Sequence, residues 1–300
     1  MRILLVLVAT LFAFAIGAQP SAPTGFALSV RNTFPNASTT GIPSGTSLTT
    51  YTGSCTITAD DTVIDAKTVN CNPLIISGAT NVTITRSKIN GEIQTAEVNT
   101  PTYYWLYVTD SEIEAQGYDG SGITGSNYKL LRVNIHGGKR PGLCWYNCLV
   151  EYSYIHGQLN DITGQNHQSG FRMEQYTTLR YNTIVCDSFE YPPEGGCSAS
   201  ISGYPDFQPI NNNLVEHNFF PITNSAEFCV YGGNTGGKPY SGDATNATYI
   251  RFVDNIFERT ATRPCGNSGP VTDFDPNRTG NLWSGNVYFP DGATIPSQVY

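Results

Sequence analysis

Apolar and polar residues alternate in short segments along most of this chain. These segments, which we call lines, end in a similar way. Towards the end of a line, a Ser or an Asn stands two positions before an apolar residue, which we call the anchor. Alternation with a period of two is typical of a β-strand, and Val, Ile, Thr, Tyr and Phe dominate the lines. The eight anchors are Ile89, Ile113, Ile135, Ile155, Ile184, Phe220, Phe257 and Tyr288.

The spacing of the anchors predicts the fold class. Successive anchors are separated by 24, 22, 20, 29, 36, 37 and 31 residues, and 30 Gly and 18 Pro can supply corners. A minimum near 20 residues with a variable excess is typical of a coiled parallel sheet, in which insertions go into the corners. We therefore predict an all-β chain, a single-stranded right-handed parallel β-helix (solenoid) of roughly nine coils. An all-β sandwich is the alternative, but it has no reason to repeat one strand's sequence.

The Ser or Asn before the anchor has a specific use in such a solenoid. Stacked at one corner of successive coils, its hydroxyl or amide can bond the backbone of the neighbouring coil. This is the place where the hydrogen bonds of the strand ladder stop. The sequence therefore predicts a polar ladder beside the ladder of anchors.

The chain divides into three parts by composition. Arg2 is followed by an apolar run that is too short to span a bilayer and that ends in small residues, so we interpret 1–18 as a signal peptide. Residues 19–50 are rich in Pro, Ser, Thr and Gly, which is typical of a linker or a loosely held leader. Residues 51–300 are expected to form the β-helix domain.

The predicted signal peptide and the cysteines both favour a secreted, extracellular protein. An even count of Cys in an exported chain indicates disulfides, and we expect each Cys to join its neighbour in the sequence. Four sequons would make the chain a glycoprotein in a eukaryotic source. The Cys pairs are Cys55 with Cys71, Cys144 with Cys148, Cys186 with Cys197 and Cys229 with Cys265, and the sequons begin at Asn36, Asn81, Asn246 and Asn277.

Charge and hydropathy limit the partners. The formal net charge is −8 and the pI is about 4.9, which argues against nucleic acid because phosphates demand basic patches. No apolar stretch after the signal peptide reaches membrane length, so we expect no membrane partner. A surface rich in Thr, Ser, Asn and Tyr suits an extracellular protein that meets neutral or weakly charged sugars. We expect a monomer with a polysaccharide substrate. A polyuronate would need a local basic cluster or a bound cation.

Two of the four His lie in equivalent positions. His136 and His156 each follow an anchor directly, on successive coils, so their imidazoles should stack about 4.8 Å apart. They either cap backbone in a corner ladder or line one wall of a cleft.

The densest polar segment is 157–174, and its last part alternates. Phe171 and Met173 alternate with Arg172 and Glu174. If the two apolar residues point inward, Arg172 and Glu174 point outward on the same face. The structural alternative is a solvated ion pair between them.

Further polar residues fall at similar positions of this and the following coils. His167 and Ser169 stand at the start of the same strand, the next coil offers Ser200 and Ser202, and the one after it offers Tyr231. A His, an Arg, a carboxylate and a Tyr on one sheet face can bind and cleave a sugar chain by acid–base chemistry.

A resemblance supports the fold. The strand-like start at Asp61–Lys67, the coil at Asn81–Ile89 and the repeated Ser or Asn resemble secreted right-handed parallel β-helix proteins of the pectate-lyase-like superfamily. The resemblance covers about residues 55–290 and implies polysaccharide lyases, glycoside hydrolases, epimerases or non-enzymatic adhesins. The catalytic motifs of polygalacturonases and pectate lyases are missing, so no catalytic role passes to a residue of this chain.

The leading hypothesis is an extracellular enzyme that cleaves a polysaccharide in a groove of the β-helix, with a lyase slightly favoured. Elimination needs a base, a cation that neutralises a uronate carboxylate, and a proton donor for the leaving oxygen. The candidate base is His167 or else His156, and the candidate neutraliser is Arg172 with Lys139 or Arg140. The candidate proton donor is Tyr231 or Tyr240.

Two alternatives stay open. A glycoside hydrolase would need two carboxylates, for which Glu174 with Asp161 or Asp273 is the candidate pair. A non-catalytic carbohydrate-binding or adhesive β-helix would use its outer aromatic residues instead. No cofactor is established. Carboxylates in the loops 187–194 and 273–275 can hold Ca²⁺, although their spacing matches no known calcium loop.

Overall fold

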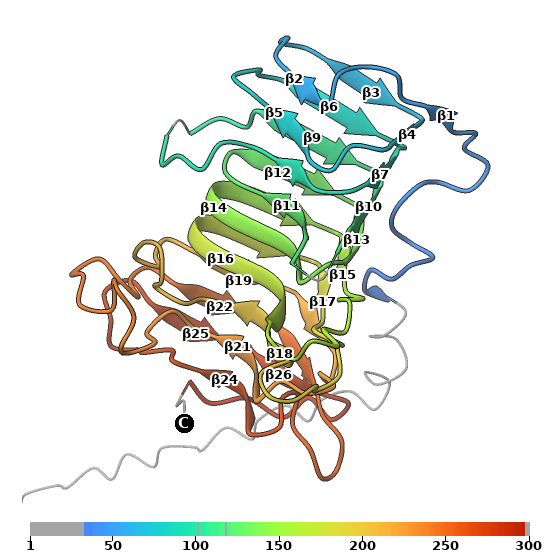
Figure 1. The fold of residues 1–300 in the computed structure, drawn as a ribbon. Coiled ribbons are helices and arrows are strands. Elements are labelled where there is room, and N and C mark those ends of the chain that lie inside the picture. The colour runs from blue at the N-terminus through green and yellow to red at the C-terminus, as the bar shows by residue number, and fades with distance from the viewer. Residues whose placement is uncertain (1–32, 101, 118, 298–300) are drawn as a thin grey trace, which may run out of the picture.

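The computed structural model describes residues 33–100, 102–117 and 119–297. All of its regular elements are strands, which form two large sheets whose paired strands run parallel. The strands stack one above another from the N-terminal to the C-terminal end of the molecule (Figure 1). This confirms the predicted all-β class with parallel sheets and agrees with a β-solenoid.

One sheet has ten strands, and it contains the anchors. Its order, β1-β4-β7-β10-β13-β15-β17-β20-β23-β26, follows the chain and takes one strand from each coil. The strands are β1 (Thr49–Thr50), β4 (Lys67–Val69), β7 (Lys88–Asn90), β10 (Glu112–Ala115), β13 (Asn134–Gly137), β15 (Tyr154–Ile155), β17 (Thr183–Ile184), β20 (Phe219–Phe220), β23 (Ile256–Glu258) and β26 (Val287–Phe289).

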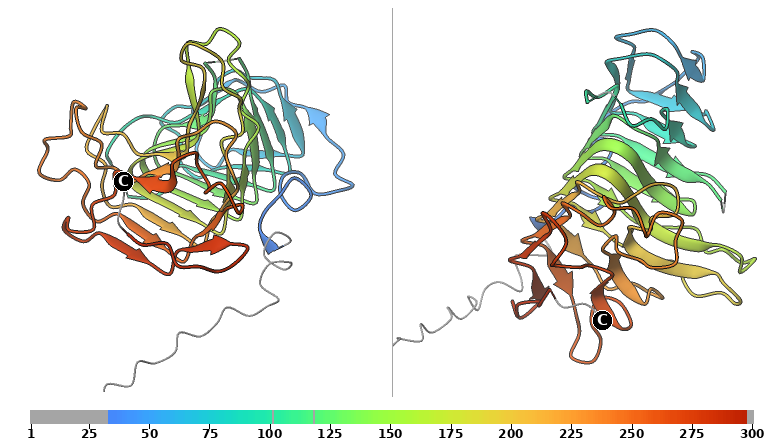
Figure 2. Two further views of the ribbon diagram at one scale, coloured as in Figure 1. Left: turned by 90° about the horizontal axis from the view of Figure 1, so that it is seen from below. Right: turned by 90° about the vertical axis from the view of Figure 1, so that its left-hand side faces the viewer.

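The other sheet has sixteen strands in two arms, which β14 (Arg140–Glu151) and β16 (His167–Arg180) join because each is long enough to belong to both. The first arm also contains β2 (Thr56–Ile57), β5 (Leu74–Ile76), β8 (Ile93–Gln94), β11 (Ser121–Thr124), β18 (Gly196–Ser202), β21 (Phe228–Tyr231) and β24 (Gly269–Thr272). The second arm contains β3 (Val63–Asp65), β6 (Val82–Thr85), β9 (Leu106–Thr109), β12 (Tyr128–Leu131), β19 (Leu214–Glu216), β22 (Arg251–Val253) and β25 (Leu282–Ser284). Figure 2 shows how these faces wrap around a common interior.

The anchors stack as predicted. Ile113 pairs with Ile89 on one side and with Ile135 on the other, and the same register continues to Ile155 and Ile184. These side chains are fully buried in one continuous apolar core. Since a slip of one residue would turn every side chain of a strand to the other face, burial of the anchors fixes the register of each coil.

The polar ladder is also present, and it is strongest in the C-terminal coils. The backbone N–H groups of Asn182, Asn218 and Asn255 each donate to the side-chain Oδ1 one coil further on, at 3.0, 2.9 and 3.0 Å. Each Nδ2 also donates to a backbone carbonyl, as that of Asn218 does to Leu179 at 2.8 Å. Val133 occupies this position in one upper coil and interrupts the ladder.

A tight corner precedes the ladder in each of these coils. The residue before the Ser or Asn has a positive φ, for example 57° at Tyr181, 53° at His217 and 54° at Asp254. A bulky residue in this region is uncommon, and the stacked neighbours hold it there. In the last coil Gly285 takes the position with a φ of 66°, which costs a glycine little.

The described part of the predicted leader lies against the solenoid. Residues 34–48 run along the side of the stack back to the first coil, as the blue segment of Figure 1 shows. Phe34 packs on Phe219 with ring centroids 5.5 Å apart, and the Gly41 N–H donates to the Arg132 carbonyl at 3.0 Å. The segment therefore crosses several coils before β1 joins the ten-stranded sheet.

Four disulfides join the predicted Cys pairs, and no Cys of the described chain is free: Cys55–Cys71, Cys144–Cys148, Cys186–Cys197 and Cys229–Cys265. Such bonds fit an oxidising, extracellular environment. Within the described ranges, no helix is long and apolar enough to cross a bilayer. The predicted signal peptide, 1–18, lies outside the described residues.

We expect Asn218→Ala to lower the free energy of unfolding by about 2–4 kcal/mol. The substitution leaves the Asn182 N–H and the Leu179 carbonyl buried without these partners, and each such group costs about 1–3 kcal/mol. Urea unfolding with the disulfides intact measures the change. Asn277→Ala, on an exposed loop, is the matched control and should stay within about 0.5 kcal/mol. Equal losses in the two variants would contradict a stabilising ladder.

Candidate functional site

A cavity of about 590 Å³ lies on the outer side of the first arm, where β14, β16, β18 and β21 follow one another. We call it the site cavity. It is lined by Lys139, Arg140, Gln165, His167, Ser169, Arg172, Cys197, Ser198, Ser202, Tyr204, Asp206, Ser225, Glu227, Tyr231 and Lys238. The sequence-predicted residues His167, Arg172 and Tyr231 are thus brought together.

Strand register explains why they meet. Phe171 and Met173 are fully buried inside the coil, so Arg172 between them projects outward. Arg172 lies beside Ser202 in the next coil, and the same register places Tyr231 in this row one coil later. Residues about 30 positions apart in the sequence therefore lie side by side in one polar row, because the parallel strands are in register.

Arg172 is the centre of a buried ion-pair network. Its Nε lies 2.6 Å from Glu174, and its Nη2 lies 3.1 Å from Asp206 and donates to the Tyr204 carbonyl at 2.9 Å. The Phe207 ring covers the guanidinium at 4.6 Å. Arg172 is only 4% exposed, because the loop after β18 folds over the outer face of β16. The solvated ion pair considered from the sequence is therefore a buried one.

Glu174 lies beneath this loop and does not line the cavity. It is 0% exposed, and its Oε2 has no hydrogen-bond partner among the described residues. Burial raises the pKa of Glu174 to about 7, although the charge of Arg172 acts in the opposite direction. The carboxyl group therefore changes its charge near neutral pH.

Arg140 and Lys139 supply positive charge at the first coil of the cavity. Arg140 Nε donates to Ser169 Oγ at 3.1 Å, and no described carboxylate pairs with this guanidinium. Burial and the neighbouring charge of Arg172 lower the pKa of Arg140 to about 10. Lys139 donates to Asn166 Oδ1 at 2.9 Å, and burial lowers its pKa as well. Both cations are desolvated without full compensation, which favours binding of an anion.

Two tyrosines and a lysine form the opposite side. The rings of Tyr204 and Tyr231 lie 4.7 Å apart, and burial raises the pKa of both hydroxyls. Lys238 Nζ lies 3.2 Å from Asp206 and 5.3 Å from the centre of the Tyr204 ring. These hydroxyls stay protonated at neutral pH and can donate a proton or a hydrogen bond.

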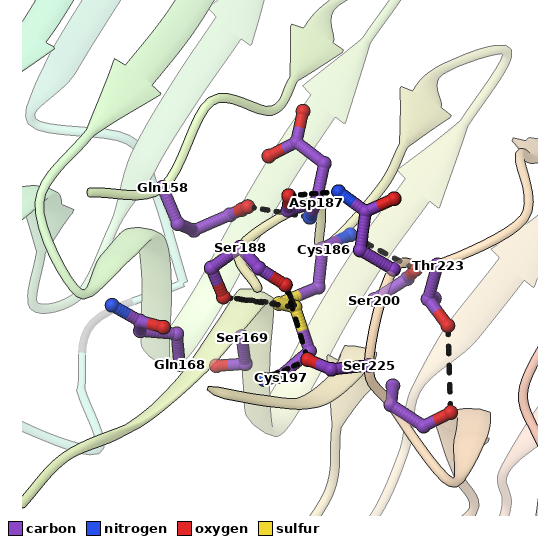
Figure 3. The surroundings of a disulfide bond; sticks show 12 residues. Gln158, Gln168, Ser169, Cys186, Asp187, Ser188, Cys197, Ser200, Thr223 and Ser225 are labelled. Atoms are coloured by element: carbon purple, nitrogen blue, oxygen red, sulfur yellow. Dashed lines mark hydrogen bonds between the residues drawn. A yellow bond between two sulfur atoms is a disulfide. The ribbon is translucent and has the colours of Figure 1, made fainter. Parts of the chain in front are cut away.

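His167 begins β16 and marks the other end of the cavity. Its Nε2 lies 3.0 Å from Glu194, and about 60% of the side chain is exposed. Figure 3 shows the Cys186–Cys197 disulfide, and Glu194 lies in the chain segment between these two residues. The Ser225 Oγ accepts a bond from the Cys197 N–H at 2.8 Å, which ties this loop to the next coil. The disulfide thus restricts the loop whose carboxylate contacts the imidazole.

Two predicted residues lie elsewhere. His156 directly follows β15 of the ten-stranded sheet, where it stacks on Tyr154 at 3.8 Å and on His136 at 5.6 Å, and burial lowers its pKa to about 4. The Asp161 carboxylate accepts backbone N–H bonds within its own loop, from Thr163 at 2.9 Å and Asn166 at 2.7 Å. Hydrogen bonding lowers the pKa of Asp161. Neither residue is among those that line the site cavity.

The described residues contain one group of side chains close enough to share a metal ion, and it lies outside the site cavity. Glu112, Glu114 and His136 project from β10 and β13. Lys88 already lies between the two carboxylates, at 3.1 and 2.8 Å, and neutralises part of their charge. This arrangement is that of a surface ion-pair cluster.

Tyr204 and Asp206 are cavity residues that the sequence analysis missed. They stand in the loop between β18 and β19, outside any alternating line. The only available signal was that the loop follows the strand with Ser200 and Ser202. Which face such a loop covers depends on contacts such as the stacking of Phe207 on Trp145, at 6.1 Å, and these are not encoded in periodicity.

A larger cavity of about 690 Å³ lies at the C-terminal end but is a weaker candidate. Its two arginines are engaged: Arg259 with Asp291, and Arg263 with the Thr223 carbonyl at 2.6 Å. It contains no histidine among its lining residues. The site cavity therefore has the richer chemistry.

Comparison with known proteins gives no relative, since no family model, no curated protein and no solved structure matches this chain. The function has to be inferred from the side chains of the site cavity.

We expect Arg172→Ala to lower the free energy of unfolding by roughly 3–5 kcal/mol at about pH 8, because it leaves Glu174 buried without its partner and the carboxyl group must either stay charged there or take up a proton. Arg132→Ala is the matched control, since Arg132 pairs with Asp110 while 45% of its side chain is exposed, and its loss should stay below about 1 kcal/mol. Denaturant unfolding compares the two. A small loss for Arg172→Ala would contradict a buried network.

Proposed function

We propose that this protein is a secreted carbohydrate-active enzyme that cleaves an acidic polysaccharide in the site cavity by elimination. One observation carries the proposal: a chain of net charge −8 gathers four cationic side chains in one cavity, and one of them, Arg140, lacks a carboxylate partner among the described residues. Only two carboxylates, Asp206 and Glu227, line the same cavity. This is the local basic cluster that an acidic polymer requires.

The fold supports this proposal. We infer a right-handed β-helix of roughly nine coils, because parallel strands joined by crossovers are right-handed in about 98% of cases. A right-handed β-helix with a groove on one outer face agrees with the resemblance to the pectate-lyase-like superfamily. The four disulfides favour an oxidising compartment, as expected for secretion.

The roles follow from the positions in the cavity. Arg140 and Lys139 would neutralise the uronate carboxylate, which acidifies the proton on the adjacent carbon. Arg172 is already paired with Glu174 and Asp206, so it positions the covering loop and adds only part of its charge. This assignment moves the neutralising role from Arg172, favoured by sequence, to Arg140.

His167 is the proposed base and Tyr231 the proposed acid. With its Nε2–H donated to Glu194, the imidazole keeps a lone pair on Nδ1 that can take the proton. The electron pair left on carbon forms the new double bond, and the bond to the glycosidic oxygen breaks. The Tyr231 hydroxyl, protonated at neutral pH, gives its proton to that oxygen.

Hydrolysis is the second candidate. It is favoured by Asp206 and Glu227, which line the cavity together. The pair suggested by the sequence is less suitable: Glu174 is buried, and Asp161 is bonded within its own loop. Asp206 is also engaged by Arg172 and Lys238, so both of its oxygens already face cations. The residues of the site cavity therefore favour elimination over hydrolysis.

We expect the purified protein to release unsaturated products from an acidic polysaccharide and not from a neutral one. A panel of polymers, followed by ultraviolet absorbance for elimination and by new reducing ends for all cleavage, separates the mechanisms. New reducing ends without unsaturation would favour the hydrolase, and binding without either would leave a carbohydrate-binding protein.

On the polymer that is cleaved, His167→Ala should lower turnover about 100-fold or more while thermal unfolding is unchanged, because the side chain is exposed and acts as the base. Arg140→Ala should lower turnover by a similar factor. Arg251→Ala, exposed on β22 outside the cavity, is the control and should keep full activity. Full activity in both cavity variants would exclude the proposed site.

A further inference from the structure

Glu174 is a buried acid that the proposed reaction leaves unused. Its Oε1 is bonded to Arg172, but no described residue bonds its Oε2. Buried polar atoms are nearly always hydrogen-bonded, so an orphan carboxylate oxygen beneath a candidate site calls for an explanation. A carboxyl group that carries a proton for part of the time provides one.

Charged groups face Glu174 from three elements. Arg172 lies on the same strand, Arg140 on β14, and Asp206 in the loop after β18. The two arginines favour the charged carboxylate, whereas burial and Asp206 oppose it. Burial is the largest effect, and the pKa of Glu174 is raised to about 7. The group is therefore balanced between its two charge states.

The charge of Glu174 controls the charge that the cavity presents. When Glu174 is ionised, two carboxylates neutralise Arg172, which lies 2.6 Å from Glu174 and 3.1 Å from Asp206. When Glu174 is protonated, only Asp206 remains, and Lys238 shares it at 3.2 Å. Protonation thus adds one positive charge beside the cavity without moving any residue.

Arg140 provides the contact for a ligand. Its Nε is held by Ser169 Oγ, which also receives a hydrogen bond from Ser202 Oγ at 3.3 Å. Its two terminal nitrogens make no hydrogen bond to a described residue. A guanidinium fixed at Nε and free at its outer edge can bind a carboxylate or a sulfate through two parallel hydrogen bonds.

We propose that the site cavity binds the anionic group of an acidic sugar at Arg140, and that Glu174 takes up a proton as it binds. The inference rests on the proposed function only in that the ligand is a sugar acid; it needs no cleavage. The anion brings a new negative charge near Glu174 and draws on the positive charge of Arg172, and both effects favour the protonated acid.

The direction of the pH dependence follows by linkage. Below about pH 7 Glu174 is already protonated, so the affinity for the anion is at its maximum and changes little. Above that pH binding requires proton uptake, and the affinity falls by up to about tenfold per pH unit until the pKa of the complex is reached. Binding and protonation strengthen one another equally.

Calorimetric titration with two small sugar acids tests the proposal. D-galacturonate offers a carboxylate and galactose 6-sulfate a sulfate, neither of which titrates near neutral pH, and methyl galactoside is the neutral blank. At about pH 8, in two buffers of different ionisation enthalpy, the wild-type protein should take up to one proton from the buffer per bound acid. The sugar acid that binds tells which anion the cavity takes.

Glu174→Gln should abolish the proton uptake, and its affinity at about pH 8 should equal the low-pH affinity of the wild type. Glu227→Gln removes a lining carboxylate by the same change and should keep the uptake. His167→Gln should keep it too. Carbon NMR of the Glu174 carboxyl in the wild-type protein gives an independent reading, because its pKa should rise when the acid binds.

Equal proton uptake in wild type and Glu174→Gln, loss of uptake in His167→Gln instead, or a Glu174 pKa that the ligand leaves unchanged would each overturn the proposal. Failure of both sugar acids to bind would overturn it as well. If the protein binds the sugar acid with proton uptake but cleaves no polymer, only the proposed function is wrong. If it cleaves a polymer but binds without proton uptake, only this inference is wrong.

Discussion

The register between successive coils is the constraint on which the rest of this structure depends. Each coil must return its anchor to the column of Ile113 and Ile135, and its ladder residue to the column of Asn218. If one coil slipped by one position, an apolar side chain would face water and a buried N–H would lose its partner. Segments between these fixed points are free to vary in length, which is why the loops that build the site could grow without disturbing the core.

The site cavity exploits this arrangement. The same register that stacks the core aligns Arg172, Ser202 and Tyr231 on the outside of three coils. Loops from neighbouring coils then cover part of this row and remove water from its charges. Desolvation leaves the cations of this acidic protein incompletely compensated, so they can bind an anion. It also raises the pKa of Glu174 to about 7. Anion binding and the protonation of Glu174 therefore have one physical origin, the burial of charged groups whose charges do not cancel.

The sequence predicted what is periodic and missed what is not. The all-β class, the parallel sheets, the anchors and the four disulfides follow from repetition and from Cys order, and the structure confirms them. His167, Arg172 and Tyr231 could be proposed from the sequence because they lie on or next to alternating strands, and the structure brings them to one cavity. Tyr204 and Asp206 line the same cavity but could not be proposed, since a loop's path is set by its tertiary contacts. The Asp161 carboxylate accepts hydrogen bonds from its own loop, and composition cannot distinguish this structural role from a catalytic one.

A crystal structure of His167→Ala with an acidic oligosaccharide would show where the polymer binds, because this variant should bind it without turning it over. We expect the oligosaccharide in the site cavity, with one of its anionic groups within hydrogen-bonding distance of the Arg140 guanidinium and a glycosidic oxygen beside the Tyr231 hydroxyl. An oligosaccharide bound on the ten-stranded sheet, or in the cavity beside Arg259 and Tyr288, would contradict it.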